Sequence, residues 1–568
     1  MRSMHLRHAP RWQAPLLAAL MVWALLAGLG LREPMPADEP RFVLAARTMV
    51  ESGEWLFPHR GIELYAEKPP VFMWLQAAGY LLVRDWHIAF LLPSLLSALL
   101  TLALSGDLAR RLWGRGAVPY AVLGLFVCLQ FALQAKRAQI DMVLVGMTTL
   151  SLWALLRYLL EKPSPWWLLL GTFAAGLGTV TKGVGFLPLL LFIPWLWVRW
   201  KSPQDLPAHR GVHALAGIAG FLLGAGVWLV PMLATALSSS DPALHAYARE
   251  MLFKQTGTRY ANAWHHVKPA WYYLQTMLTL WLPGVLLVPW LLPAWWRRLK
   301  RIDARHTLLL GWALLVLLFF SASPGKREVY IFPMLPALAV AAAPLLPGLL
   351  RFRGVRTTLW AYVSVLILMT GTLGLWLMAA PPERLHALVD GRGMDMTTVS
   401  QFSRWLLGFA IVAALVAIAA RRRVGVALVA VTAALWTAYG LGFMPAISPD
   451  SSAQALMRRV GERIGPEAEL AMLGWREQHL LQADRPVTDF GFKQPWVDQW
   501  QHAHAWLLEA PDTRWLFLRK DAIGPCLDPS QVVDVGASNR RDWILAPGHA
   551  WMTGCEVPAT WSADVSED

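Results

Sequence analysis

Acidic and basic side chains recur beside long apolar segments, and they are the residues best suited to chemistry. Asp38-Glu39-Pro40-Arg41 follows the first apolar stretch, and Glu67-Lys68 closes the same polar segment. A positioned carboxylate can accept a proton from an acceptor group or orient it. Lys or Arg can stabilise the negative charge that grows on a departing phosphate. These two residue types together predict group transfer on an anionic substrate.

A structural role would also explain the acidic pair. Pro40 suits the first turn of a helix, and acidic residues are favoured at helix N-termini. The apolar positions that follow keep helical spacing: Phe42, Ala45, Ala46, Met49 and Val50. Asp38 and Glu39 could therefore cap an amphipathic surface helix. The spacing alone does not decide between capping and catalysis.

Polar residues also separate the later apolar segments. Lys182 lies in a very short turn, where a charge is expensive and indicates a functional site. Lys68, at the end of the first polar segment, could extend to water or bind a lipid phosphate as a point charge. The other polar residues of these loops are Lys136, Arg137, Asp141, Arg259, His265, His266, Lys326 and Arg327.

Motifs for other chemistries are missing from the sequence. There is no GxxxxGK[ST] loop, which an ATP-driven pump would need, and no HExxH zinc motif. The adjacent His265 and His266 could join a metal site, but neighbouring histidines alone do not define one. We expect no firmly required cofactor, and a divalent metal stays an open alternative.

The composition places these residues in a membrane protein. Of 568 residues, 56% are hydrophobic and 15% charged, and the mean hydropathy is +0.41. The formal net charge is +14, but the basic residues lie in short loops rather than in one continuous patch. This distribution favours the positive-inside rule over nucleic-acid binding.

Apolar segments recur up to residue 443 and predict about thirteen membrane spans, each near the ~20 residues that a spanning helix needs. We interpret the first as a retained span rather than a signal peptide, and 69–83 as an interfacial helix. The predicted spans are 14–31, 88–107, 117–135, 142–160, 166–181, 184–198, 213–236, 271–293, 307–321, 329–349, 358–379, 404–420 and 424–443.

Alternate loops differ in charge and thereby predict the orientation. Five loops rich in Lys and Arg share one side; they begin near Arg110, Arg199, Arg297, Arg351 and Arg421. Because such loops stay cytoplasmic, the first long loop, 32–70, is expected outside. The chain is thus predicted to be a bacterial inner-membrane protein with its active site and C-terminus in the periplasm.

The C-terminal part has a different composition and predicts a second domain. We expect a transmembrane domain over 1–445 and a small periplasmic α/β domain over 446–568. Its expected strands and helices are 469–473, 515–518 and 532–535, and 453–464 and 496–509. Cys526 and Cys555 would lie in an oxidising compartment, where they could form a disulfide or remain two free thiols.

The order of the motifs resembles the GT-C membrane glycosyltransferases, in particular the lipid A aminoarabinose transferases and their protein O-mannosyltransferase relatives. The similarity covers about residues 14–350. It rests on these segments: Asp38-Glu39-x-Arg41, Glu67-Lys68-Pro69-Pro70, Gln139-Ile140-Asp141-Met142, Thr181-Lys182-Gly183, the loop from Tyr260 to Tyr273, and Ser323-Pro324-Gly325-Lys326-Arg327 with Tyr330 and Pro333. Pro40 departs from the small residue that the aminoarabinose transferases carry there.

The resemblance implies roles for individual residues. Asp38 would be the key carboxylate, with Glu39 as a second catalytic candidate and Arg41 beside them. The donor phosphate would be surrounded by Arg41, Lys68, Arg259, Lys326, Arg327 and Tyr330. Glu67, Asp141, Lys182 and His266 would complete the site.

Three functions are consistent with the sequence. The first is an inverting glycosyltransferase that takes a sugar from a polyprenyl (undecaprenyl) phosphate donor to lipid A or another envelope acceptor. The second is a protein O-mannosyltransferase. The third is a transporter of a lipid-linked sugar, which should show internal repeats and polar groups at mid-membrane. The charges here favour span ends instead. Membrane lipids are expected partners, and nucleic acid is not.

Overall fold

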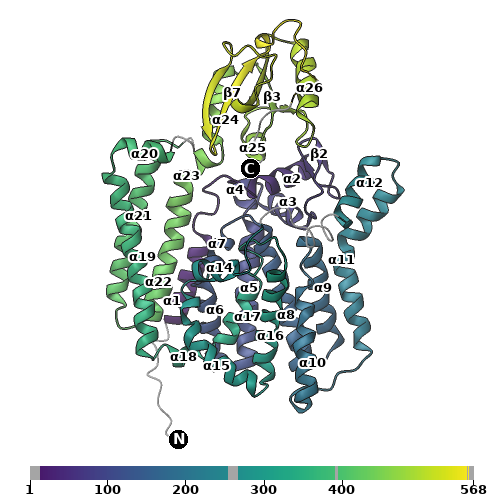
Figure 1. Ribbon diagram of the computed structural model, residues 1–568. Coiled ribbons are helices and arrows are strands. Elements are labelled where there is room, and N and C mark those ends of the chain that lie inside the picture. The colour runs from purple at the N-terminus through teal and green to yellow at the C-terminus, as the bar shows by residue number, and fades with distance from the viewer. Residues whose placement is uncertain (1–12, 254–266, 390–393, 559–560, 562–568) are drawn as a thin grey trace.

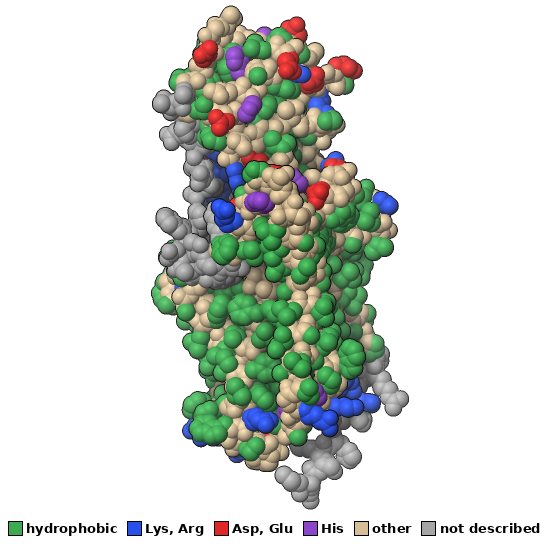
Figure 2. All heavy atoms as spheres, turned by 90° about the vertical axis from the view of Figure 1, so that its right-hand side faces the viewer, with side chains coloured by type: hydrophobic (Ala, Val, Ile, Leu, Met, Phe, Trp, Pro, Cys, Tyr) green, Lys and Arg blue, Asp and Glu red, His purple; other side chains and the backbone are tan. Residues whose placement is uncertain are grey.

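The computed structural model describes residues 13–253, 267–389, 394–558 and 561. A helical bundle carries a small α/β domain at one end, and short helices of the first loop lie between them (Figure 1). Lys and Arg side chains gather at the opposite end of the bundle, below a broad hydrophobic face (Figure 2). This distribution is typical of a membrane protein that obeys the positive-inside rule.

Seven helices among the described residues are long and apolar enough to cross a membrane. Two bent pairs raise the count to nine if each pair forms one span, with bends of 72° and 103°. The long helices belong to α5 (Leu92–Trp113), α8 (Ile140–Leu160), α11 (His213–Ser238), α16 (Ala304–Ala322), α19 (Arg353–Ala379), α21 (Met396–Ala419) and α22 (Val424–Ala438). The bent pairs are α6 (Val118–Phe126) with α7 (Leu129–Ala135), and α14 (Tyr272–Leu280) with α15 (Val288–Lys300). The chain is therefore a multi-pass helical membrane protein.

The four other predicted spans are also helical but shorter, interrupted or less apolar. They correspond to α1 (Gln13–Leu26), α9 (Pro165–Lys182), α10 (Phe192–Lys201) after the 3-10 turn η2 (Leu187–Leu191), and α17 (Met334–Ala342) with α18 (Leu346–Leu349). Hydropathy over a window does not register such breaks, so the total of thirteen stays a prediction.

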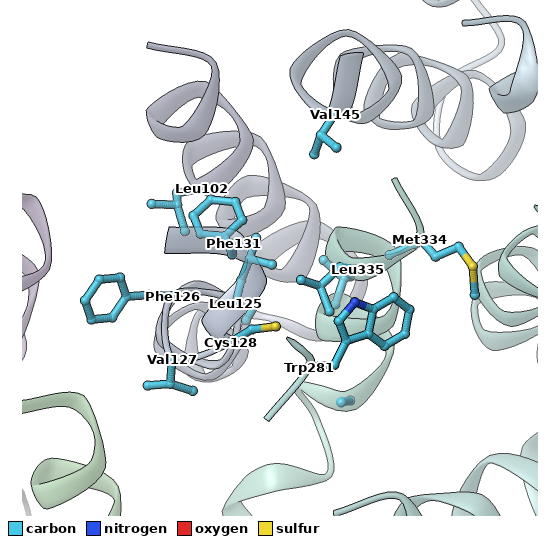
Figure 3. Packing of buried hydrophobic residues seen from close by; sticks show 14 of the residues in the cluster. Leu102, Leu125, Phe126, Val127, Cys128, Phe131, Val145, Trp281, Met334 and Leu335 are labelled. Carbon is cyan, nitrogen blue, oxygen red and sulfur yellow. The ribbon is translucent and has the colours of Figure 1, made fainter. Parts of the chain in front are cut away.

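Close helix approach and dense apolar packing hold the bundle together. A Cβ added to Gly176 of α9 would lie 2.3 Å from the carbonyl oxygen of Phe221 in α11, so only glycine permits this contact. Deeper in the bundle, Leu125, Phe131 and Trp281 pack with their neighbours (Figure 3). All three are at most 6% exposed.

The first loop folds into short elements that rest on the bundle. α2 (Glu39–Ser52) buries Phe42, Ala45, Ala46 and Met49, as the helical spacing predicted. The strands β1 (His59–Arg60) and β2 (Glu63–Leu64) form a small antiparallel pair. They are followed by α3 (Val71–Val83) and α4 (Trp86–Ala89). The 13 residues of α3 are too few to cross a bilayer.

Two short helices follow long helices of the bundle at the end near the C-terminal domain. α12 (Pro242–Arg249) follows α11, and α20 (Pro382–Val389) follows α19. The chain leaves α22 through a π-helical turn and α23 (Met444–Ser451).

The C-terminal part forms a five-stranded mixed sheet of order β4-β3-β5-β7-β6. β3 (Glu469–Leu473) runs parallel to β4 (Val487–Asp489) and β5 (Arg514–Arg519), and β7 (Arg541–Pro547) runs antiparallel to β5 and β6 (Val533–Ser538). Its helices are α24 (Gln454–Ile464), α25 (Glu477–Gln482) and α26 (Trp496–Glu509). β4 and β7 were not predicted, because β4 is very short and β7 lacked a clear alternating pattern.

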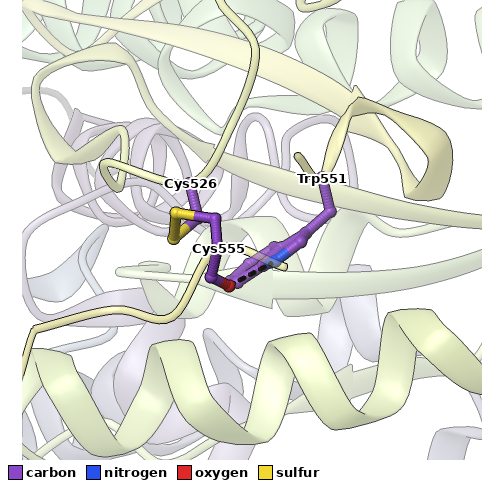
Figure 4. Close-up of a disulfide and its surroundings, with 3 residues drawn as sticks. All are labelled: Cys526, Trp551 and Cys555. Carbon is purple, nitrogen blue, oxygen red and sulfur yellow. Dashed lines mark hydrogen bonds between the residues drawn. A yellow bond between two sulfur atoms is a disulfide. The ribbon is translucent and has the colours of Figure 1, made fainter. Parts of the chain in front are cut away.

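Cys526 and Cys555 form a disulfide next to Trp551, whose Nε1 donates to the carbonyl oxygen of Cys555 at 3.2 Å (Figure 4). The two cysteines are 29 residues apart. Closing a loop of this length should stabilise the domain by about 2–4 kcal/mol.

We expect dithiothreitol to lower the unfolding temperature of the C-terminal domain in the wild-type protein. The same treatment of the Cys526→Ala variant serves as the control and should have no further effect. A wild-type unfolding temperature that does not respond to reductant, together with alkylation of both cysteines in untreated protein, would show that the bond is absent.

Candidate active site

Asp38 directly precedes α2 but does not cap it. Its side chain makes no capping hydrogen bond, so the structure does not support the capping interpretation for this residue. One carboxylate oxygen, Oδ2, accepts hydrogen bonds from Nη2 of Arg327 at 3.2 Å and from Nε2 of Gln139 at 3.1 Å. The Asp38 side chain is 20% exposed to solvent. The carboxylate is thus held by partners from distant segments and is still accessible.

The electrostatic surroundings keep Asp38 ionised. Burial, the largest influence, would raise the pKa of Asp38, but the positive charges of Arg327, Arg41 and Lys182 together outweigh it. The pKa of Asp38 therefore lies below its ordinary value. At neutral pH the group is an anion with little tendency to take up a proton.

A second ion pair lies beside the first. Lys182 pairs with Asp141, and its ammonium lies 5.2 Å from the ring centroid of Tyr330. Burial tends to lower the pKa of Arg327, but the charges of Asp38 and Asp141 raise it above its usual range. The two pairs thus form one cluster of alternating charge.

Lys182 is the last residue of α9, and a tight turn follows it. Gly183 ends α9 with φ 75°, a left-handed conformation that favours glycine. A Cβ on Gly185 would lie 1.9 Å from the carbonyl carbon of Gly178. The turn therefore folds tightly against its own helix.

Arg41 joins the first loop to the C-terminal domain. Its Nε donates to Oε1 of Glu477 at 2.8 Å, and its Nη1 lies 3.6 Å from Oε2 of Glu67. Arg60 contacts the same Glu477 at 2.7 Å. Arg41 was predicted to bind the donor phosphate. In the structure Arg41 is ion-paired, and its positive charge also helps to lower the pKa of Asp38.

Glu39, the second candidate for a catalytic carboxylate, lies in a buried ion pair, and its catalytic role stays a prediction. Glu39 is 5% exposed, and Arg32 donates to both of its oxygens at 2.5 and 2.7 Å. The backbone amides of Met35 and Ala138 donate to it as well, each at 2.9 Å. Both oxygens of Glu39 thus accept hydrogen bonds, and the residue anchors the first loop to the segment between α7 and α8.

Lys326 and Tyr330 lie beside Arg327 in the turn between α16 and α17. The ammonium of Lys326 donates to the carbonyl oxygens of Ser323 and Lys268 at 2.6 and 3.3 Å, so it holds the turn to the chain before α14. Tyr330 supports Lys182 through its ring. Lys326 is 4% exposed, which makes direct contact with a phosphate depend on movement of the turn.

The remaining predicted residues are placed less centrally. Glu67 contacts Arg41, and Lys68 is partly exposed just before α3. Arg259 and His266, with the neighbouring His265, lie outside the described residues. Among the residues that the structure does describe, no group of three or more His, Cys, Asp or Glu side chains could hold a metal ion.

The sequence did not single out Arg32, Arg60 or Glu477 as part of this region. Arg32 directly follows the first apolar segment, and a charge at that place could have been noticed. Glu477 follows β3, and nothing in the sequence connects it with Arg41, 436 residues away.

Known proteins resemble this chain in sequence and in fold. The model of the dolichyl-phosphate-mannose-protein mannosyltransferase family matches residues 67–223. The chain is 32% identical over 375 residues to undecaprenyl phosphate-alpha-4-amino-4-deoxy-L-arabinose arabinosyl transferase 1 of Pseudomonas fluorescens, covering 64% of this chain and 65% of that relative. The transferase of the same name from Pseudomonas savastanoi pv. phaseolicola is 30% identical over 66% of this chain and 68% of its own length.

The chain belongs to the undecaprenyl phosphate-aminoarabinose arabinosyl transferase family. The crystal structure of the family's ArnT protein from Cupriavidus metallidurans, bound to undecaprenyl phosphate, has a TM-score of 0.73 to this chain. It covers 94% of this chain and 98% of that one at 21% identity. The likeness shows that the chain shares the helical membrane fold of that protein.

Proposed function

We propose that this chain transfers 4-amino-4-deoxy-L-arabinose from undecaprenyl phosphate to lipid A. Membership of the family supports the donor, and the solved relative was crystallised with undecaprenyl phosphate. The observation that carries the proposal is the accessible Asp38 carboxylate, held ionised by Arg327 and flanked by the Lys182–Asp141 pair.

The reaction is a direct displacement. An acceptor oxygen attacks the anomeric carbon of the sugar while the bond to the phosphate oxygen breaks, and undecaprenyl phosphate leaves with the bonding electrons. Attack opposite the leaving group inverts the anomeric carbon. Arg327 and Lys182 stabilise the charge that develops on the leaving phosphate. Asp38 orients the sugar and the acceptor from the accessible side.

A phosphate acceptor fits the electrostatics better than a hydroxyl acceptor. A lipid A phosphate is already anionic and needs no base, whereas the hydroxyl of Ser or Thr must lose a proton. Cations hold the pKa of Asp38 below its ordinary value, which makes it a poor base near neutral pH. The proposal requires no bound metal, and we expect transfer to persist in the presence of EDTA.

Protein O-mannosyl transfer is the second candidate, and the family match over residues 67–223 favours it. Expression of the chain in a bacterium that lacks its own aminoarabinose transferase but makes the donor distinguishes the two. We expect mass spectrometry to find lipid A carrying aminoarabinose. Unmodified lipid A in cells that contain the full-length chain would contradict the proposal.

We also propose the full topology of about thirteen spans, with the site and the C-terminal domain in the periplasm of a bacterial inner membrane. The support is the concentration of basic side chains at the far end of the bundle (Figure 2). An alkaline phosphatase fused to the C-terminus should be active. An inactive phosphatase combined with an active cytoplasmic reporter at the same position would reverse the orientation.

A further inference from the structure

A charged recess in the C-terminal domain is not used by the proposed mechanism. It has a volume of about 630 Å³, within the usual range of ligand sites. The end of β5 and the turn between β6 and β7 form its walls. Four basic and two acidic side chains line it with one amide: Arg519, Lys520, Arg540, Arg541, Asp521, Asp542 and Asn539.

The carboxylates do not balance the positive charge around the recess. Arg519 is 4% exposed and its Nε donates to Asp521 at 2.9 Å. Arg476 lies close by, and burial followed by repulsion from Arg541 and Arg519 holds its pKa below the usual range. Arginines that crowd in this way gain from an anion placed among them.

The recess lies on the side of the domain that faces the bundle. Nδ2 of Asn539, in the β6–β7 turn, donates to the carbonyl oxygen of Ser451 at the end of α23 at 3.2 Å. Figure 1 shows β7 and α24 directly above α23. The turn that lines the recess is therefore held next to the membrane domain.

Charged residues also connect the recess to the active site. The positive charge of Arg41 helps to lower the pKa of Arg476. Arg41 also pairs with Glu477 and helps to lower the pKa of Asp38. A series of guanidinium groups thus leads from Asp38 into the C-terminal domain.

We propose that this recess binds a second phosphate group of the acceptor, an inference that rests on the proposed function. Lipid A carries more than one phosphate, so one can react beside Asp38 while another is held at a distance. The donor has a single phosphate, whose charge the cations beside Asp38 already stabilise. Arginine is the side chain that best fits a phosphate, through paired hydrogen bonds. The C-terminal domain would then select acceptors and orient them.

The double variant Arg540→Gln with Arg541→Gln tests the inference, because both side chains line the recess. Arg458→Gln is the matched control, an exposed arginine of the same domain that pairs with Glu462 in its own helix. Each full-length protein is assayed with bis-phosphorylated lipid A and with lipid A that keeps only the reacting phosphate. Binding of undecaprenyl phosphate is measured in parallel.

For the double variant we expect the KM for bis-phosphorylated lipid A to rise on the order of tenfold, the effect of losing one charged hydrogen bond. Its KM for the mono-phosphorylated acceptor, its kcat and its binding of undecaprenyl phosphate should match those of Arg458→Gln. An equal rise with both acceptors, or no rise with either, would overturn the inference. Adding phosphatidylglycerol to the assay should leave the difference intact. If it removes the difference, the recess binds anionic lipid in general, and the inference is overturned. A wild-type chain that modifies neither acceptor would instead refute the proposed function.

Discussion

Replacing Asp38 with Asn is expected to lower sugar transfer on the order of a hundredfold or more, because misplaced reactants can cost about that much in rate. Asn keeps the shape and can still accept the hydrogen bonds from Arg327 and Gln139. It lacks the negative charge that orients the sugar and the acceptor. The variant should therefore be produced, inserted and folded as the wild type is. Initial rates with the purified protein measure the loss.

The matched control is Asp85→Asn. Asp85 caps α4, and its Oδ1 accepts from the amide of His87 at 2.9 Å. Asn caps a helix about as well as Asp, so this change should leave both stability and transfer unaltered. Transfer by Asp38→Asn at the wild-type rate would show that Asp38 has no chemical role. The search for the carboxylate would then move to Asp141.

Replacing Glu39 with Gln should mainly destabilise the protein. Arg32 would remain buried without its carboxylate, and breaking a buried pair in this way costs about 3–5 kcal/mol. Burial alone would lower the pKa of Arg32, but Glu39 keeps it above its usual range, so the guanidinium stays charged. We expect a lower yield and a lower unfolding temperature in detergent.

Two comparisons separate this structural effect from a catalytic one. Glu51→Gln breaks an exposed pair with Arg47 and should cost no more than about 1 kcal/mol. Removing both charges in Arg32→Gln with Glu39→Gln should recover part of the lost stability. If Glu39→Gln unfolds at the wild-type temperature and yet loses transfer, Glu39 is catalytic after all.

The sequence predicted those parts of the site that depend on local pattern. The spacing of Phe42, Ala45 and Met49 predicted α2, and Asp38 was a candidate carboxylate because it follows the first apolar stretch, although the spacing did not decide between capping and catalysis. The short interval between two apolar segments predicted the turn at Lys182. Each of these features is decided by neighbouring residues.

Features that depend on distant contacts could not be predicted. Asp38 and Glu39 are adjacent and chemically alike, and only the fold brings Arg32 and the amide of Ala138 to Glu39. The pairing of Arg41 with Glu477 likewise requires the C-terminal domain to be placed above α2. The bends between α6 and α7 and between α14 and α15 arise from breaks of a few residues, which averaged hydropathy does not detect.

We propose that this chain moves aminoarabinose from undecaprenyl phosphate to lipid A. The most direct measurement uses the purified full-length protein with undecaprenyl phosphate-aminoarabinose and lipid A, followed by mass spectrometry of both lipids. We expect lipid A to gain aminoarabinose while an equal amount of undecaprenyl phosphate is released. Release of undecaprenyl phosphate without modified lipid A, or no reaction of a folded protein that binds the donor, would contradict it.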